Sequence, residues 1–179
     1  MFLALAALSA CGASSAAAPI AGKETGSHQA NKTAAKGGAT AGAGAISMIC
    51  AAETRTNVGQ QLAVSTIDAT PKMVTRGNDH TCTYRLRSPQ GPGTFVVSIH
   101  RGADPAAASA YLAAERRRDG GPRVALLGSD AFTRTDGTTF TQKDDLVLKV
   151  DPTHLPTGEQ RTQIAQSISF EILACWTEG

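Results

Sequence analysis

The four cysteines have the most distinctive chemistry in this chain, and they lie in two different sequence settings. Cys11 follows an apolar run that begins at Phe2, whereas Cys50, Cys82 and Cys175 lie in the mixed sequence further along. A cysteine thiol can be acylated, be oxidised to a disulfide, bind a metal or attack a substrate. The setting of each cysteine therefore decides which of these reactions we expect.

Residues Leu8-Ser9-Ala10-Cys11 resemble the end of a bacterial lipoprotein signal peptide. The resemblance implies that residues 1–10 are a signal peptide, cleaved before Cys11, and that the Cys11 thiol receives a diacylglycerol while its new amino group is acylated. Met1-Phe2 lacks the usual positive charge of such a leader. The apolar run is too short to span a bilayer, which takes roughly 20 residues. We expect a protein held by lipid on the extracytoplasmic face of the cell membrane.

Residues 11–47 are dominated by Ala, Gly, Ser and Thr, with Ile20 as the only bulky apolar residue before Ile46. Such a segment buries too little surface to offset the entropy of ordering it. An Ala-rich helix is the alternative, but Gly42 and Gly44 are among several glycines that disfavour it. We predict a disordered tether over 11–47, followed by one globular domain over 48–179.

The charge distribution argues against a nucleic-acid partner. The tether holds three lysines and one glutamate of the 17 basic and 15 acidic residues, which leaves 14 of each sign in residues 48–179. Binding to nucleic acid rests on neutralising phosphates, and a globular part with no net charge is poorly suited to that. The net charge of +2 instead lies in the segment next to the membrane.

Other motifs that could carry chemistry are weak. The four histidines are scattered, with no pair at metal-ligand spacing, and there is no Gly-x-Ser-x-Gly and no glycine-rich phosphate loop before a helix. Asp144-Asp145 and Gly128-Ser129-Asp130 are typical of turns. We therefore predict no catalytic residue, no metal and no cofactor.

One charge cluster is a candidate contact site. Arg116, Arg117 and Arg118 are consecutive, and Arg123 follows closely. They could contact phospholipid head groups or an acidic partner. The alternative is an exposed helix end, where arginines complement the helix dipole.

The pattern of residues 51–101 predicts a helix followed by strands. The helix is expected over 51–66, and strands over 72–76, 81–87 and 94–101. In the second strand apolar and polar residues alternate, which indicates one buried face.

Two further helices flank a hairpin. Asp104-Pro105 is a good helix start, and the arginine run ends that helix, which should turn inward Ala107, Ala110, Tyr111 and Ala114. Strands at 138–141 and 146–150 form the hairpin. A last helix over 158–176 carries Ile164, Ile168 and Ile172, with Ala165 and Cys175, on one side. The result is an α+β fold: an antiparallel sheet of about five to six strands with helices packed on one face.

In an exported protein two of the three later cysteines should form a disulfide, and three pairings are possible. Position favours Cys50 with Cys82, because a cysteine at a helix start and one in a strand can meet at the sheet edge. Cys175 continues the apolar stripe of the last helix, where a thiol acts as a small hydrophobe. Pairings with Cys175 stay open at this point.

These features together resemble a family of actinobacterial envelope lipoproteins of unknown function. The resemblance rests on the motif ending at Cys11, the small-residue tether, Cys50 at a helix start, Cys82-Thr83-Tyr84 in a strand, and the turn Leu127–Phe132. It implies an exported α+β domain with a Cys50–Cys82 bridge and no established activity. We expect a non-enzymatic module that binds or senses an envelope protein or a small ligand. A structural or accessory subunit of an envelope complex is the alternative, with an enzyme a third.

Overall fold

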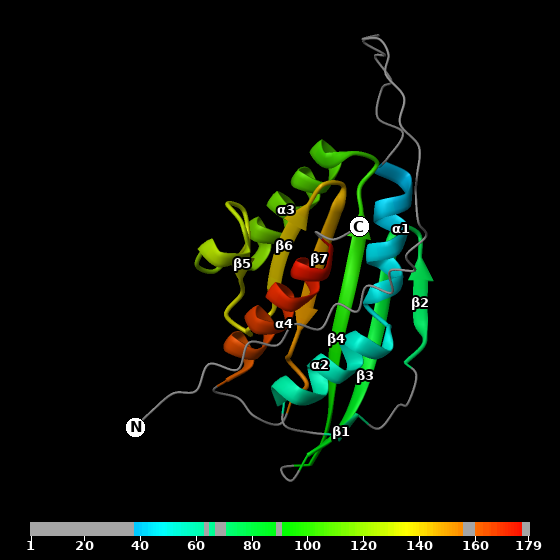
Figure 1. The fold of residues 1–179 in the computed structure, drawn as a ribbon. Helices are drawn as coiled ribbons and strands as arrows, with labels where there is room; N and C mark the ends of the chain where they lie inside the picture. Colours follow the sequence, from blue (N-terminus) through cyan, green and yellow to red (C-terminus); the bar gives the residue numbers. More distant parts are fainter. Residues whose placement is uncertain (1–37, 63–64, 67–70, 89–90, 156–159, 177–179) are drawn as a thin grey trace, which may run out of the picture. The chain divides into compact units, whose positions relative to one another are not determined.

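A seven-stranded antiparallel sheet is the centre of the computed structural model (Figure 1). Its strands lie in the order β1-β3-β4-β7-β6-β5, and β2 pairs with the same edge of β3 as β1. The structure describes residues 38–62, 65–66, 71–88, 91–155 and 160–176. The predicted signal peptide, Cys11 and most of the predicted tether lie outside these residues.

The elements follow in chain order, with strands mostly joined to their neighbours. The helices are α1 (Gly38–Met48), α2 (Ala52–Leu62), α3 (Pro105–Asp119), the short 3-10 helix η1 (Ala125–Leu127) and α4 (Arg161–Trp176). The strands are β1 (Ser65–Thr66), β2 (Met73–Arg76), β3 (Asp79–Ser88), β4 (Gly91–Arg101), β5 (Phe132–Thr133), β6 (Thr139–Lys143) and β7 (Leu146–Asp151). The α+β class and the antiparallel sheet are confirmed. The sheet has more than the five to six strands predicted, because β1 and β5 are additional strands of two residues each.

The predicted hairpin of β6 and β7 is present, and β2, β3 and β4 are also joined as hairpins. β2 pairs with β3 through a tight turn in which Gly77 has a φ of +59°, a value that glycine adopts without a side-chain clash. β3 pairs with β4 along its whole length, and β6 with β7. Asp144, at the turn of the second hairpin, has a φ of +54°, which Asp tolerates better than most residues. The Asp144-Asp145 pair is a turn, as predicted.

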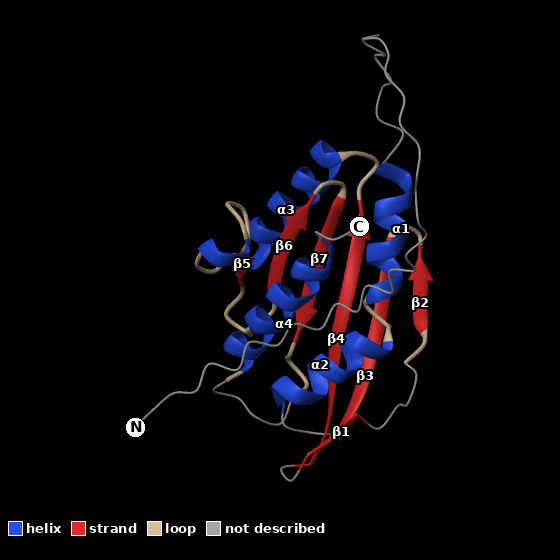
Figure 2. Ribbon diagram, in the orientation of Figure 1, coloured by secondary structure: helices blue, strands red, loops and turns tan. Residues whose placement is uncertain are grey.

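One face of the sheet is covered by α1, α2 and α4, which lie on the near side of the strands in Figure 2. The alternate residues of β3, β4 and β7 turn toward these helices, and Tyr84, Phe95, Val97 and Leu148 are fully buried there. From α4, Ala165, Ile168 and Ile172 enter the same core. The apolar stripe predicted for the last helix is therefore its buried side, with Ile164 and Cys175 half-buried at its margin.

Helix α3 packs on the opposite face, so the predicted one-sided arrangement holds for α1, α2 and α4 only. Its Ala108 and Leu112 contact Phe132, Phe140 and Val147. Val147 points away from its neighbours Leu146 and Leu148, which belong to the other core. Asp104 caps the helix as predicted, accepting a hydrogen bond from the Ala107 amide at 2.8 Å. The predicted inward stripe was wrong in part: Tyr111 packs against this core, but Ala110 is exposed, and Ala108 and Leu112 are buried instead. An alanine-rich helix lacks an apolar pattern that would fix its rotation.

The predicted tether was also wrong over residues 38–47, which belong to α1. Ala45 and Ile49 are buried in the main core, and a Cβ on the buried Gly42 would lie 3.6 Å from the Arg101 guanidinium. Packing of α1 against the sheet and α4 outweighs the low helix propensity of its glycines. The folded unit consequently starts near residue 37 rather than 48.

The first predicted helix is shorter than expected. Helix α2 ends at Leu62, and Ser65–Thr66 form β1, paired with Arg87 and Leu86. Thr66 belongs to a residue type that favours strands over helices, and its backbone pairs at the sheet edge instead of extending α2. Residues 63–64 lie outside the described part.

Two bonds fix the junction of α1 and α2 to the sheet, and a third joins the two helices to each other. Cys50 and Cys82 form a disulfide with a Cα–Cα distance of 5.5 Å, so the predicted pairing is confirmed. The Tyr84 hydroxyl donates a hydrogen bond to the Ile49 carbonyl, and the Thr54 hydroxyl donates one to the Met48 carbonyl at 2.6 Å. Cys175 takes no part in the disulfide and is half-buried.

Removing the disulfide should destabilise the domain strongly. The bridge closes a loop with a sequence separation of 32, for which the chain-entropy model gives roughly 3–4 kcal/mol. We expect Cys82→Ala to lower the free energy of unfolding by about 2–5 kcal/mol in urea titrations. Cys175→Ala is the matched control and should cost less, because it removes no covalent link. Equal losses for the two variants would contradict this assignment.

Asp151 ends β7 and has a lowered pKa. Burial by itself would raise the pKa of this carboxyl, but hydrogen bonds from the Thr153 hydroxyl and amide, with the Lys149 ammonium 3.4 Å away, outweigh burial and hold the pKa below 3.8. A carboxyl whose pKa is lower in the folded state stabilises the fold above its unfolded pKa. That contribution is lost as the pH falls through the folded pKa.

Asp151→Asn should therefore reduce the free energy of unfolding at neutral pH, because the amide cannot keep the charge-assisted bonds. The difference between wild type and variant should shrink as the pH falls below about 4. Urea titrations at several pH values measure it, with the exposed Asp130→Asn as a control that should stay within about 0.5 kcal/mol of wild type. A difference that persists unchanged into strong acid would refute this account.

Candidate functional site

The predicted arginine cluster is divided by the fold. Arg116 lies over the Phe132 ring at 5.9 Å from its centroid, and Arg118 pairs with Glu115 at 3.2 Å. Arg117 and Arg123 are exposed and form no ion pair within the part of the chain that the structure describes. Of the four arginines, only Arg117 and Arg123 are therefore available to contact head groups or a partner.

Glu115 is the centre of a partly buried charge network. Its second carboxylate oxygen accepts from Arg134, whose guanidinium lies 4.7 Å from the centroid of Phe140. The Glu115 and Arg134 side chains are 13% and 16% exposed, whereas Arg118 is 75% exposed. Arg134 therefore depends on Glu115 for the compensation of a buried charge.

Glu115→Ala should destabilise the fold by about 3 kcal/mol, since it leaves the Arg134 guanidinium buried without its counter-charge. Arg118→Ala removes the exposed partner of the same carboxylate and should cost less than about 1 kcal/mol. Thermal or urea unfolding of the two variants compares them directly. Similar losses would show that Arg134 finds another counter-charge.

His100 joins β4 to β3 and to α3. His100 Nδ1 lies 2.9 Å from an Asp79 carboxylate oxygen, and its ring stacks on Tyr111 with centroids 3.7 Å apart. Burial raises the pKa of Tyr111, and the charges of Glu115 and Asp79 raise it further, so the phenol stays neutral. Among the described residues no three His, Cys, Asp or Glu side chains lie close enough to hold a metal ion.

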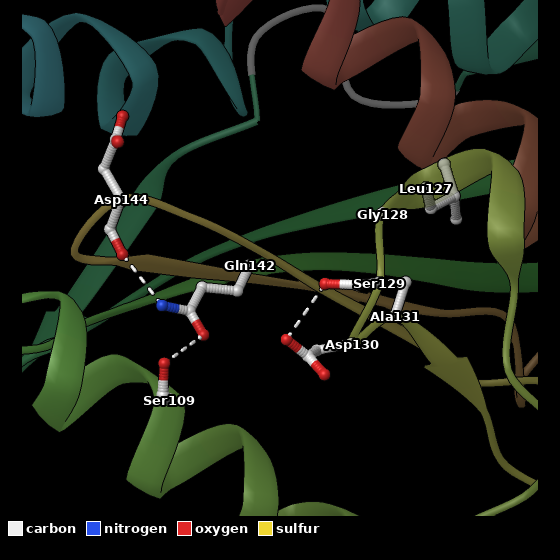
Figure 3. A pocket seen from close by; sticks show the side chains of 8 residues that line it. All are labelled: Ser109, Leu127, Gly128, Ser129, Asp130, Ala131, Gln142 and Asp144. Carbon is white, nitrogen blue, oxygen red and sulfur yellow. Dashed lines mark hydrogen bonds between the residues drawn. The ribbon is translucent and has the colours of Figure 1, made fainter.

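A small polar pocket of about 150 Å³ opens beside β6, between α3 and the turn after η1 (Figure 3). The Gln142 amide accepts from Ser109 and donates to the Asp144 carbonyl, and the Ser129 hydroxyl donates to Asp130. The turn Gly128-Ser129-Asp130 thus forms one wall. These polar groups bond to one another, and the volume suits a few waters or one small polar molecule.

Exposed apolar side chains are the feature that sequence reasoning missed. Leu126 is 86% exposed, Phe170 57% and Val74 51%. Residues 124–127 form a continuous apolar run, yet the 3-10 turn buries only Val124 and Leu127 of them and turns Leu126 outward. The exposure of Leu126 follows from the three residues per turn of a 3-10 helix. A 3-10 helix has no clear sequence signal, so this exposure could not be predicted.

Comparisons with known proteins give no guide to this site. No family model, no curated protein and no solved structure matches the chain. No helix in the described part of the chain is long and apolar enough to cross a membrane. The function must therefore be argued from the chain's own residues.

Proposed function

We propose that the protein is an exported, lipid-anchored domain of the cell envelope that binds a partner without catalysing a reaction. The observation that carries this proposal is the Cys50–Cys82 disulfide, which pins the α1–α2 junction to a central strand, with Cys82 fully buried. Structural disulfides of this kind belong to oxidising compartments outside the cytoplasm. The disulfide and the motif ending at Cys11 thus support the same location by independent chemistry.

The anchor itself rests on the sequence around Cys11. Small residues at positions 9 and 10 allow the bond before Cys11 to be cleaved in extended form, and the polar and small residues after it cannot continue the apolar run. A diacylglycerol with an added acyl chain supplies the two or more chains that stable anchoring needs, at about 0.8 kcal/mol per buried methylene. The folded unit beyond residue 37 would then stand at the extracytoplasmic surface.

Binding is favoured over catalysis by how the polar side chains are used. The Asp79–His100 pair is stacked against Tyr111, and the hydroxyls and amide of the pocket beside β6 bond to one another. An enzyme needs a nucleophile or base whose bonding capacity is directed at a substrate. An accessory subunit of an envelope complex is the alternative, and stable co-purification with one partner through an apolar surface would favour it.

Cys11→Ser should abolish lipid attachment. In cell fractionation the wild-type protein should remain with the membrane, and mass spectrometry should find loss of residues 1–10 with an added diacylglycerol on Cys11. The Cys11→Ser protein should be released or stay unprocessed. Cys175→Ser is the matched control and should remain in the membrane fraction.

A wild-type protein that is secreted into the medium with an unmodified N-terminus would contradict the anchor. Alkylation of the denatured protein checks the compartment separately. Cys50 and Cys82 should react only after reduction if the protein is exported and oxidised.

A further inference from the structure

The pocket beside β6 presents hydrogen-bond acceptors but no unused side-chain donor. Of the residues that line it, only Ser109, Ser129 and Gln142 have side-chain N–H or O–H groups. Every one of those hydrogens is already donated to another atom of the protein. What remains available in the pocket is therefore a set of oxygen lone pairs.

The Gln142 amide lies at one wall of the pocket. Its Nε2 donates one hydrogen to the Pro105 carbonyl of α3 and the other to the Asp144 carbonyl, both at 3.0 Å. Carbonyls only accept hydrogen bonds, so these two partners fix which way the amide faces. Its Oε1 accepts the Ser109 hydroxyl at 3.0 Å, and both of these oxygens keep a lone pair for a further donor.

The turn after η1 supplies a negative charge at the other wall. The Ser129 hydroxyl donates to Oδ2 of Asp130 at 3.2 Å. In Figure 3 the Asp130 carboxylate is directed toward Gln142 and Ser109, whereas the Asp144 carboxylate points away from them. No Lys, Arg or His lines the pocket, and the described part of the chain has no ion pair to either carboxylate.

We propose that this pocket binds the ammonium group of a small primary amine. An ammonium has N–H donors and no acceptor, and it would meet Gln142 Oε1, the oxygens of Ser109 and Ser129, and the Asp130 carboxylate. The bond to the carboxylate is charge-assisted and so roughly twice as strong as a neutral one. An anion would meet a carboxylate and no side-chain donor.

The size of the pocket limits the amine to a few atoms. Its volume is about 150 Å³. At roughly 30 Å³ for each water of the liquid, this corresponds to about five non-hydrogen atoms. Ethanolamine, with an ammonium at one end and a hydroxyl at the other, is a suitable probe of this size.

A metal ion fits the same acceptors less well. Ca²⁺ is typically held by about six to eight oxygens, several of them from carboxylates. Only the Asp130 carboxylate is directed into this pocket, and no three His, Cys, Asp or Glu side chains of the described residues lie close enough to hold a metal. Neutral oxygens around one carboxylate instead match an ion with a single charge and several N–H donors.

A titration followed by nuclear magnetic resonance tests the class of ligand. The full chain carrying Cys11→Ser, which has no lipid, is titrated with ethanolamine while the backbone amide shifts of the pocket residues are recorded. We expect saturable shifts with a dissociation constant in the millimolar range, because so small a ligand makes few contacts. Tetramethylammonium has the charge without an N–H, and ethylene glycol has no charge, so neither should give saturable shifts.

No saturable shift with ethanolamine would overturn the proposal, and so would an equal response to tetramethylammonium or ethylene glycol. Ca²⁺ that binds the same residues more tightly than ethanolamine does would also overturn it, because the pocket would then be a metal site.

Substitutions locate the contact. Asp130→Asn should weaken ethanolamine binding about tenfold or more, because it removes the charged acceptor. Ser129→Ala removes a neutral acceptor and should weaken binding about threefold. The matched control Glu53→Gln removes an exposed carboxylate from α2, which packs on the other face of the sheet, and should leave binding within about twofold.

Wild-type affinity in Asp130→Asn, or an equal loss in Glu53→Gln, would refute the assignment to this pocket. Since Asp130→Asn is expected to unfold like the wild type, its loss of binding would not reflect unfolding. The inference rests on the proposed binding role only in naming a ligand for it. Because the tested protein has neither lipid nor partner, failure here leaves the anchor and the envelope partner standing, and failure of the anchor leaves the titration intact.

Discussion

The attachment of the α1–α2 junction to β3 is the interaction on which the rest of the fold depends. The chain has few aromatic residues, 4% in all, and its main core is built largely from Ile, Val, Leu and Ala. Tyr84 supplies much of the volume at the centre, and its hydroxyl can be buried only because the Ile49 carbonyl accepts its hydrogen bond. The Cys50–Cys82 bridge holds that carbonyl in place. Burial raises the pKa of Tyr84, so the bond keeps a neutral donor throughout the physiological range.

Elements with a local signal could be predicted from the sequence, and those decided by long-range packing could not. The Asp104 cap and the Asp144-Asp145 turn each depend on a few adjacent residues, and both were predicted correctly. Helix α1 has the opposite character, because its glycines disfavour a helix and only contacts with Arg101, the sheet and α4 make one stable. The prediction of which side of α3 is buried was incomplete for a related reason. Alanines lie on every side of this helix, so Tyr111 and Leu112 select its buried face through their contacts with His100 and Phe140.

The candidate site shows the same difference between local sequence signals and long-range packing. Four arginines close in sequence suggested one basic patch, yet the fold gives Arg116 an aromatic ring and Arg118 a carboxylate. Glu115 decides this outcome. Its side chain is 13% exposed and faces Arg134, but the sequence does not distinguish it from an ordinary glutamate on a helix surface. The exposure of Leu126 was equally hidden, since an apolar run indicates burial whatever the turn that contains it.

The helices cover the two faces of the sheet unequally. Helices α1, α2 and α4 cover one face, and α3 alone packs on the other. Helix α3 covers β5, β6 and β7 on its face and reaches β4 where Tyr111 stacks on His100. The residues further along β3 and β4 on that face, such as Thr83, Thr94 and Ser98, remain at least partly open to solvent. This open polar face of β3 and β4 is the part of the sheet that the proposed envelope partner would find uncovered by helices.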